Sequence, residues 1–185
     1  DRNNTPSSRW YSGSGIYRDV DLTITDDVHV DLNGTKVTTP NLETEKGSTV
    51  NTNVTATVAN DSDAAKSVAV RHTVFPKDGS ADQSIGTVTT NAQSIAAGAT
   101  AEIQATVPVS NPELWSVENP SLYTVRTEVL VDGQVTDTYD TEYGFRYFNF
   151  DSNTGFSLNG ENMKLKGVCM HHDQGSLGAC LLYTS

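Results

Sequence analysis

The residues with the clearest chemical potential lie close together near the end of the sequence. His171, His172 and Asp173 directly follow a short, mostly apolar run, residues 165–170. An imidazole can hydrogen-bond neighbouring hydroxyl groups and gains strength as charge develops on a substrate. A short apolar strand that ends in His and Asp is typical of a barrel strand with its functional residues at the C-terminal end. The alternative is a histidine that only satisfies backbone groups near the end of a strand.

Metal and thiol chemistry are poorly supported by the same region. Consecutive residues on a strand point to alternate faces, so His171, His172 and Asp173 are not expected to share one metal ion. No cation adjoins Cys169, and we expect this residue to be a small buried apolar side chain rather than a nucleophile. The only other cysteine is Cys180, so no disulfide framework is expected.

Composition excludes several classes of function. The 185 residues contain 12 Lys and Arg against 23 Asp and Glu, which gives a formal net charge of −11. Phosphate binding needs clustered basic residues, and none occur, so no nucleic-acid partner is expected. No apolar run approaches the roughly 20 residues of a membrane span. Hydrophobic residues make up 36% of the chain, which is enough for a folded core.

The middle of the chain must supply a β scaffold. Apolar and polar residues alternate over residues 28–32, 50–58, 67–75, 101–107 and 123–131. Alternate side chains of a strand face opposite sides, so each segment offers one apolar face. Asp132-Gly133 predicts a tight hairpin turn, and we find no amphipathic helix between residues 26 and 146. About seven strands over about 120 residues predict an all-β, immunoglobulin-like β-sandwich.

The flanks divide the rest of the chain. We assign residues 25–146 to the sandwich, residues 1–24 to the end of a preceding domain, and residues 147–179 to the start of a following one. Within the last segment, Asn159-Gly160 predicts a hairpin turn, followed by a strand over residues 164–170. Residues 180–185 match the translation of a sequencing-library adapter, and we interpret them as an artefact rather than a natural C-terminal strand.

Three segments in order resemble glycoside hydrolase family 2. Residues 9–20 resemble the closing segment of its N-terminal sugar-binding-like jelly roll. The immunoglobulin-like domain is matched by a segment that reads Pro112-Glu113-Leu114-Trp115-Ser116-Val117-Glu118-Asn119-Pro120-Ser121-Leu122-Tyr123. The start of its (β/α)₈ catalytic barrel is matched by Gly144-Phe145-Arg146, by Phe156-Ser157-Leu158-Asn159-Gly160 and by residues 166–173. The resemblance implies a truncated jelly-roll strand before the sandwich and the first barrel strand after it.

The resemblance also implies an activity. The parent protein would be a retaining glycosidase, most similar to β-galactosidases, with β-glucuronidase or β-mannosidase as alternatives. Such enzymes need two carboxyl groups. In this family both are Glu residues on later barrel strands, and the signatures around them are absent here. We therefore assign no catalytic residue and expect the chain alone to be inactive. A non-catalytic immunoglobulin-like surface domain is the competing hypothesis.

Site roles follow from the same resemblance. His171 matches the family histidine that contacts sugar hydroxyls, and Asp173 matches an acid of the same cluster that could bind a hydroxyl or orient His171. The carbohydrate substrate would be a β-galactoside. No cofactor or metal is expected in this chain, whereas Mg and Na are possible in the parent. The parent could be a homo-oligomer, and its compartment stays open between bacterial cytoplasm, secretion and the cell surface.

Several residues have structural interpretations. Pro112 and Pro120 restrict the residues before them, so we expect Asn111 and Asn119 to be extended. We expect Trp115 to plug the open end of the sandwich. His29 and His72 fall in predicted strands and are expected to be structural or exposed.

Overall fold

A computed structural model describes Ile16 and residues 19–169. The chain divides into two units, Thr25–Lys164 and a second that groups Asp1–Ile24 with Leu165–Ser185. The described residues of the second unit, 16, 19–24 and 165–169, form no helix or strand. Among the described residues, no helix has the length and apolarity to cross a membrane. The fold and the site below belong to Thr25–Lys164.

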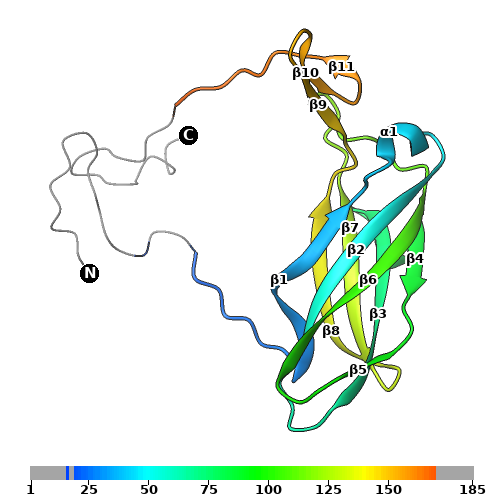
Figure 1. Ribbon diagram of the computed structural model, residues 1–185, viewed down its shortest axis with the longest axis vertical. Coiled ribbons are helices and arrows are strands. Elements are labelled where there is room, and N and C mark those ends of the chain that lie inside the picture. Colours follow the sequence, from blue (N-terminus) through cyan, green and yellow to red (C-terminus); the bar gives the residue numbers. More distant parts are fainter. Residues whose placement is uncertain (1–15, 17–18, 170–185) are drawn as a thin grey trace, which may run out of the picture. The chain divides into compact units, whose positions relative to one another are not determined.

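Two antiparallel sheets form the body of this unit (Figure 1). The first has the strand order β1-β2-β6, and the second has the order β4-β3-β7-β8, with β5 also paired to β3. This architecture is the all-β, immunoglobulin-like sandwich predicted from the sequence. The strands are β1 Val28–Thr38, β2 Thr49–Asn60, β3 Lys66–Pro76, β4 Gly86–Thr89, β5 Gln93–Ile95, β6 Ala99–Ser110, β7 Tyr123–Val131 and β8 Gln134–Tyr143. Two short turns of helix, α1 Leu42–Glu45 and η1 Ala81–Gln83, were not foreseen.

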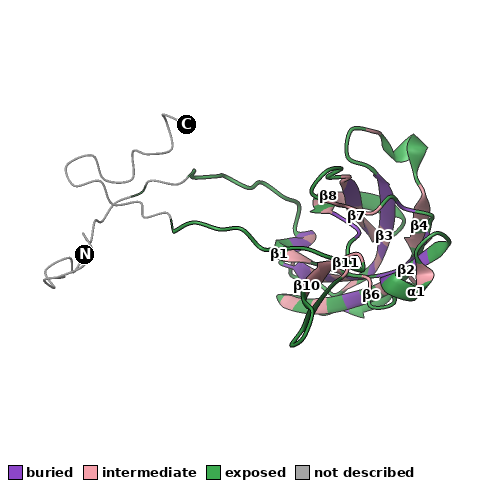
Figure 2. Ribbon diagram, turned by 90° about the horizontal axis from the view of Figure 1, so that it is seen from above, coloured by how far each residue is buried: buried purple, intermediate pink, exposed green. Residues whose placement is uncertain are grey.

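Side-chain alternation explains why these segments form strands. In β2, Val50 and Val54 are fully buried, whereas Asn51 and Asn53 between them are exposed. The same alternation runs through β3 and β7, and Figure 2 shows buried segments on the strands that enclose the interior. One face of each sheet therefore removes its valines from water, which is the main driving force for the two sheets to pack.

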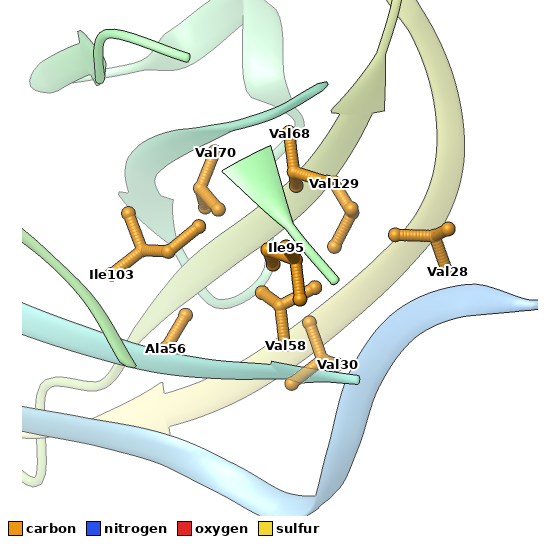
Figure 3. Close-up of a cluster of buried hydrophobic side chains, with 9 residues drawn as sticks. All are labelled: Val28, Val30, Ala56, Val58, Val68, Val70, Ile95, Ile103 and Val129. Carbon is orange, nitrogen blue, oxygen red and sulfur yellow. The ribbon is translucent and has the colours of Figure 1, made fainter. Parts of the chain in front are cut away.

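The interior contains two apolar clusters. The first lies nearer β5 and is drawn in Figure 3. It consists of Val28, Val30, Ala56, Val58, Val68, Val70, Ile95, Ile103 and Val129. The second consists of Leu42, Val50, Val54, Val74, Val107, Val109, Tyr123, Val125 and Phe145. Each fully buried Val, Leu or Phe side chain in these clusters stabilises the fold by about 1.5–3 kcal/mol relative to exposure.

Hydrogen bonds join the sheets along both edges. On one edge, the Val30 amide donates to an Asp137 carboxylate oxygen at 2.9 Å, and the Thr35 and Thr141 hydroxyls lie 2.7 Å apart. On the other edge, the Ser110 amide donates to the Ile85 carbonyl at 2.8 Å. These contacts satisfy backbone groups at strand edges that would otherwise be free to pair with another chain.

A small third sheet follows the sandwich. It comprises β9 Phe148–Asp151, β10 Gly155–Leu158 and β11 Glu161–Asn162, in the order β11-β10-β9. The turn between β10 and β11 is Asn159-Gly160, with φ of 52° and 89°. Asp132-Gly133 turns between β7 and β8 in the same way, with φ of 51° and 80°. Both hairpin turns predicted from the sequence are confirmed.

Some local predictions were wrong. Cys169 was expected to be buried, but it is exposed in the structure. Asn111 was expected to be extended, but its φ is 41°. Asn tolerates this left-handed conformation, and the amide of Asn111 donates to the Ser48 carbonyl at 2.8 Å. The strand predicted over residues 164–170 is not formed in its described part, residues 164–169. No described strand pairs with it, and a strand needs a partner for its backbone groups.

Candidate functional site

The two residues predicted to bind substrate, His171 and Asp173, lie outside the described residues. Their roles therefore stay predictions. The site that the structure does describe is the end of the sandwich where the 112–122 loop meets the β9–β11 sheet.

The 112–122 loop is fastened to the sandwich by its own polar groups. The Glu113 amide donates to the Tyr123 hydroxyl at 2.8 Å, and the Ser121 hydroxyl donates to the Glu113 carboxylate at 3.1 Å. Burial raises the pKa of Tyr123, so its phenol stays neutral and keeps this acceptor in place. Between these anchors, the Ser116 amide donates to the Asn119 carbonyl at 2.9 Å. The loop is a fixed element rather than a loose connection.

Trp115 lies where three segments of chain converge. Its amide donates to the Phe145 carbonyl at 2.8 Å, and the Arg146 guanidinium stands 5.2 Å from its ring centroid. A Cβ atom at Gly144 would come within 3.1 Å of the Trp115 side chain, a tight contact that glycine avoids. Trp115 is half-buried and lies outside the two apolar clusters. It packs across the exit from β8, whereas its neighbour Leu114 contacts the core.

Asn159 ties the third sheet to this loop. Its side-chain amide donates to the Trp115 carbonyl at 3.0 Å, and its side-chain oxygen accepts from the Tyr147 amide at 3.2 Å. Tyr147 also contacts Lys46, whose ammonium lies 4.9 Å from the ring centroid. The sequence identified Asn159 as a turn residue only. Its second role as a clamp depends on the distant Trp115 loop and has no local signal.

A cavity of about 550 Å³ lies between the loop and the hairpin. Its lining mixes apolar and polar side chains, and the full set is Leu114, Ser116, Val117, Glu118, Leu158, Asn159, Glu161, Asn162 and Met163. Both carboxylates, Glu118 and Glu161, belong to exposed residues. A glycosidase acid needs a sheltered carboxyl whose pKa is raised. The cavity can therefore bind or pack, and it does not present a hydrolytic pair.

No metal centre is formed by the part of the chain that the structure describes, because no group of three His, Cys, Asp or Glu side chains converges there. The described histidines have structural surroundings, as expected. His29 lies beside the Asp26 carbonyl, with its Nδ1 at 2.9 Å. His72 is fully buried between the sheets, with Nδ1 3.1 Å from the Thr127 hydroxyl. Desolvation lowers the pKa of His72 to about 4.

The third sheet carries an apolar face that the sandwich does not cover. Phe150 pairs with Phe156 and Phe148 pairs with Leu158, so these four side chains share one face. The three phenyl rings contact one another, with centroid distances between 5.0 Å and 6.5 Å. Phe148 is nevertheless 63% exposed and Phe150 67% exposed. Exposed apolar patches occur at interaction surfaces and also promote aggregation.

Comparison with known proteins connects this arrangement to an enzyme family. The model of Glycosyl hydrolases family 2 matches residues 28–146, more than half of the chain. A β-galactosidase of Bacteroides ovatus, BoGH2A, is 38% identical over 176 residues, which cover 95% of this chain and 20% of that protein. A putative β-glucuronidase of Formosa agariphila is 34% identical over 173 residues, which cover 94% of this chain and 15% of that protein.

Solved structures give the same result. A family 2 glycosyl hydrolase of Bacteroides cellulosilyticus superposes with a TM-score of 0.79 at 35% identity, over 92% of this chain and 23% of that one. A Bacteroides uniformis β-glucuronidase superposes with a TM-score of 0.72 at 29% identity, over 85% of this chain and 19% of that one. The chain thus spans a fifth or less of the two curated relatives described above. On the family match and these likenesses together, the chain belongs to glycosyl hydrolases family 2.

Proposed function

We propose that this chain is a part of a retaining β-galactosidase that lacks the two catalytic carboxyl groups, and that its sandwich acts as a rigid spacer beside the catalytic barrel. The observation that carries the proposal is the 38% identity to a β-galactosidase over 95% of the chain. The chain contributes fold and positioning. The two carboxyl groups of the reaction, about 5–5.5 Å apart in retaining glycosidases, belong to the rest of the parent.

The architecture of Thr25–Lys164 supports a spacer. Both edges of the sandwich are closed by hydrogen bonds between the sheets, and Asn159 clamps the third sheet to the Trp115 loop. The exposed face of Phe148 and Phe150 then offers an apolar surface to the part of the parent protein that follows. Covering this face would remove it from water and fix the following domain relative to the sandwich.

The active-site contribution of this chain is proposed for His171 and Asp173. We propose that His171 hydrogen-bonds sugar hydroxyls as charge develops at the transition state, and that Asp173 binds a hydroxyl or orients His171. In the full-length protein, His171→Ala should lower kcat/KM by about 10²-fold or more, because a transition-state hydrogen bond is lost. His172→Ala serves as the matched control, since we assign no role to that side chain.

Substrate assays of the full-length parent test the proposal. It should release nitrophenol from the β-galactoside faster than from the β-glucuronide or the β-mannoside, whereas the 185-residue chain should hydrolyse none of them. The glucuronide is the strongest alternative, because several relatives at comparable identity are named β-glucuronidases. Preferential release from the glucuronide would overturn the galactoside assignment. A parent without the two barrel Glu residues would overturn the hydrolase assignment itself.

A further inference from the structure

The sequence contains two Asn-Gly pairs, Asn33-Gly34 and Asn159-Gly160, and the structure surrounds them very differently. In such a pair, the backbone nitrogen of the glycine can attack the side-chain carbonyl carbon of the asparagine. Glycine allows this approach because it carries no side chain and restricts the backbone least. Both asparagines have positive φ, 55° for Asn33 and 52° for Asn159. Backbone conformation in φ therefore does not separate them, and the remaining contacts must.

Asn33 lies at the tip of a bulge in β1. The pairing of β1 with β2 stops at Val30 and resumes at Thr35, so residues 31–34 have no ladder partners. The bend that results is visible in β1 (Figure 1). Asn33 is exposed, and its neighbour Leu32 is 76% exposed. In the described part of the chain, the one side-chain hydrogen bond within residues 31–34 joins the Leu32 amide to the Asp31 carboxylate at 2.7 Å. The Asn33 side chain is free to rotate toward the Gly34 nitrogen.

Asn159 is held on every side. Its side-chain amide and oxygen are both engaged, by the Trp115 carbonyl and the Tyr147 amide. Its own backbone amide donates to the Tyr147 carbonyl at 2.9 Å. The residue is half-buried, and Gly160 lies beneath the Tyr147 hydroxyl. For the Gly160 nitrogen to attack, these hydrogen bonds must first open.

We propose that Asn33 is a site of spontaneous deamidation in this domain and that the fold protects Asn159 from the same reaction. The Gly34 nitrogen forms a bond to the Asn33 side-chain carbon and loses its proton. The Asn33 amide nitrogen leaves as ammonia, which closes a five-membered succinimide. Water then adds to either ring carbonyl and opens the ring to aspartate or isoaspartate.

The product changes the bulge chemically and electrostatically. One further negative charge is added to a chain of net charge −11, close to Asp31. Isoaspartate also inserts a methylene group into the backbone beside Gly34. A Cβ atom on Gly34 would already come within 2.7 Å of the Asp31 carbonyl oxygen and 2.9 Å of that of Thr57. The backbone there has little space, so the isoaspartate form should pair β1 less well with β2.

Peptide mapping of the 185-residue chain tests the proposal. The folded chain is incubated at mildly alkaline pH, digested, and analysed by mass spectrometry for amide-to-acid conversion and for isoaspartate at each Asn-Gly pair. Conversion at Asn33 should be at least about tenfold faster than at Asn159, because two hydrogen bonds of ordinary net strength hold the second side chain. A second incubation in urea should bring the two rates close together.

Two variants make the comparison specific. Asn33→Gln should abolish conversion at that peptide without changing the rate at Asn159. Tyr147→Phe is the control variant, because it keeps both asparagines and leaves the Tyr147 amide in place. Asn159→Ala cannot serve as this control, because it removes one of the two asparagines. Gly34→Ala is unsuitable because its Cβ would collide with the backbone. Faster or equal conversion at Asn159 in the folded chain would overturn the proposal. So would a difference between the sites that persists unchanged in urea, because the fold would then not be its cause.

Discussion

Replacing His72 by leucine should abolish much of the stability loss that the domain undergoes in mild acid. His72 is fully buried between the two sheets, and in the described residues its Nε2 atom has no hydrogen-bond partner. Nδ1 lies 3.1 Å from the Thr127 hydroxyl. The groups along the strand pairings beside it are Val88 on β4 and Thr127 on β7, neither of which is charged. A protonated imidazole would therefore lie in apolar surroundings with no counter-charge from these neighbours.

The magnitude follows from the pKa. Desolvation lowers the pKa of His72 from 6.5 in an exposed histidine to about 4 in the folded domain. Each pKa unit corresponds to about 1.4 kcal/mol, so the difference is worth about 3 kcal/mol. Above pH 6.5, both folded and unfolded states hold the neutral ring, and no stability is lost. Between pH 6.5 and about 4, only the unfolded state takes up the proton, so the free energy of unfolding falls as the pH falls.

Urea unfolding of Thr25–Lys164, followed by Trp115 fluorescence across this pH range, measures the effect. Between neutral pH and pH 4, the free energy of unfolding of the unsubstituted domain should fall by about 3 kcal/mol more than that of His72→Leu. Carboxylates contribute to both curves equally; the pKa of Glu128, for example, is lowered chiefly by its hydrogen bonds from Arg71. The difference between the curves therefore isolates His72. His29→Gln is the matched control, and its stability should change with pH as steeply as that of the unsubstituted domain.

Two results would refute this reasoning. If His72→Leu loses stability with falling pH as steeply as the parent, another group is responsible. If NMR of the folded domain shows the His72 ring titrating near the pKa of an exposed histidine, the ring is not desolvated as the structure requires. A loss of stability in His72→Leu that is independent of pH would shift its whole curve without changing the slope of stability against pH. Such an offset cannot be mistaken for the predicted effect, which concerns only that slope.

Three further outcomes are expected. Phe145→Ala should cost about 3–5 kcal/mol in urea unfolding, because the ring is fully buried and makes edge contacts with two tyrosines at 5.1 Å; a cost below 1 kcal/mol would contradict this packing. Asn159→Ala should cost about 1–3 kcal/mol and speed hydrogen exchange at the Tyr147 amide, and unchanged exchange would exclude the clamp. Phe148→Ser with Phe150→Ser should slow aggregation in light scattering while leaving the unfolding midpoint nearly unchanged; equal aggregation would show that another surface is responsible.

Much of the fold could be predicted because strand formation depends on local sequence patterns. Alternation in residues 50–58 and 123–131 gave strands in the right places, since one face of each had to be apolar. The turns at Asp132-Gly133 and Asn159-Gly160 were equally legible, because few residues accept positive φ. The alternation even places His72 on the same side as Val70 and Val74. That it has no charged partner in its strand pairings is visible only once β7 lies beside it.

The candidate site was less predictable. Trp115 was expected to plug the open end of the sandwich, but it packs across the exit from β8 against Gly144 and Arg146. The clamp by Asn159 joins residues 44 positions apart and has no periodic signal. The prediction that Asn111 is extended was wrong for a similar reason. Its left-handed conformation accompanies a hydrogen bond to Ser48, which is distant in the sequence. Roles for His171 and Asp173 stay predictions from resemblance.

The sequence by itself determined the class of this protein: strand spacing and turn chemistry are local properties, so they specify an all-β sandwich and its hairpins. The tertiary structure decided which residues face each other. Strand register brings Phe148, Phe150 and Phe156 to one exposed face, and it leaves Asn33 outside the pairing of β1 with β2. Side-chain hydrogen bonds, in contrast, hold Asn159 within a network. Two identical Asn-Gly pairs thus acquire different chemical surroundings, because hydrogen-bond partners come from segments that only folding brings together.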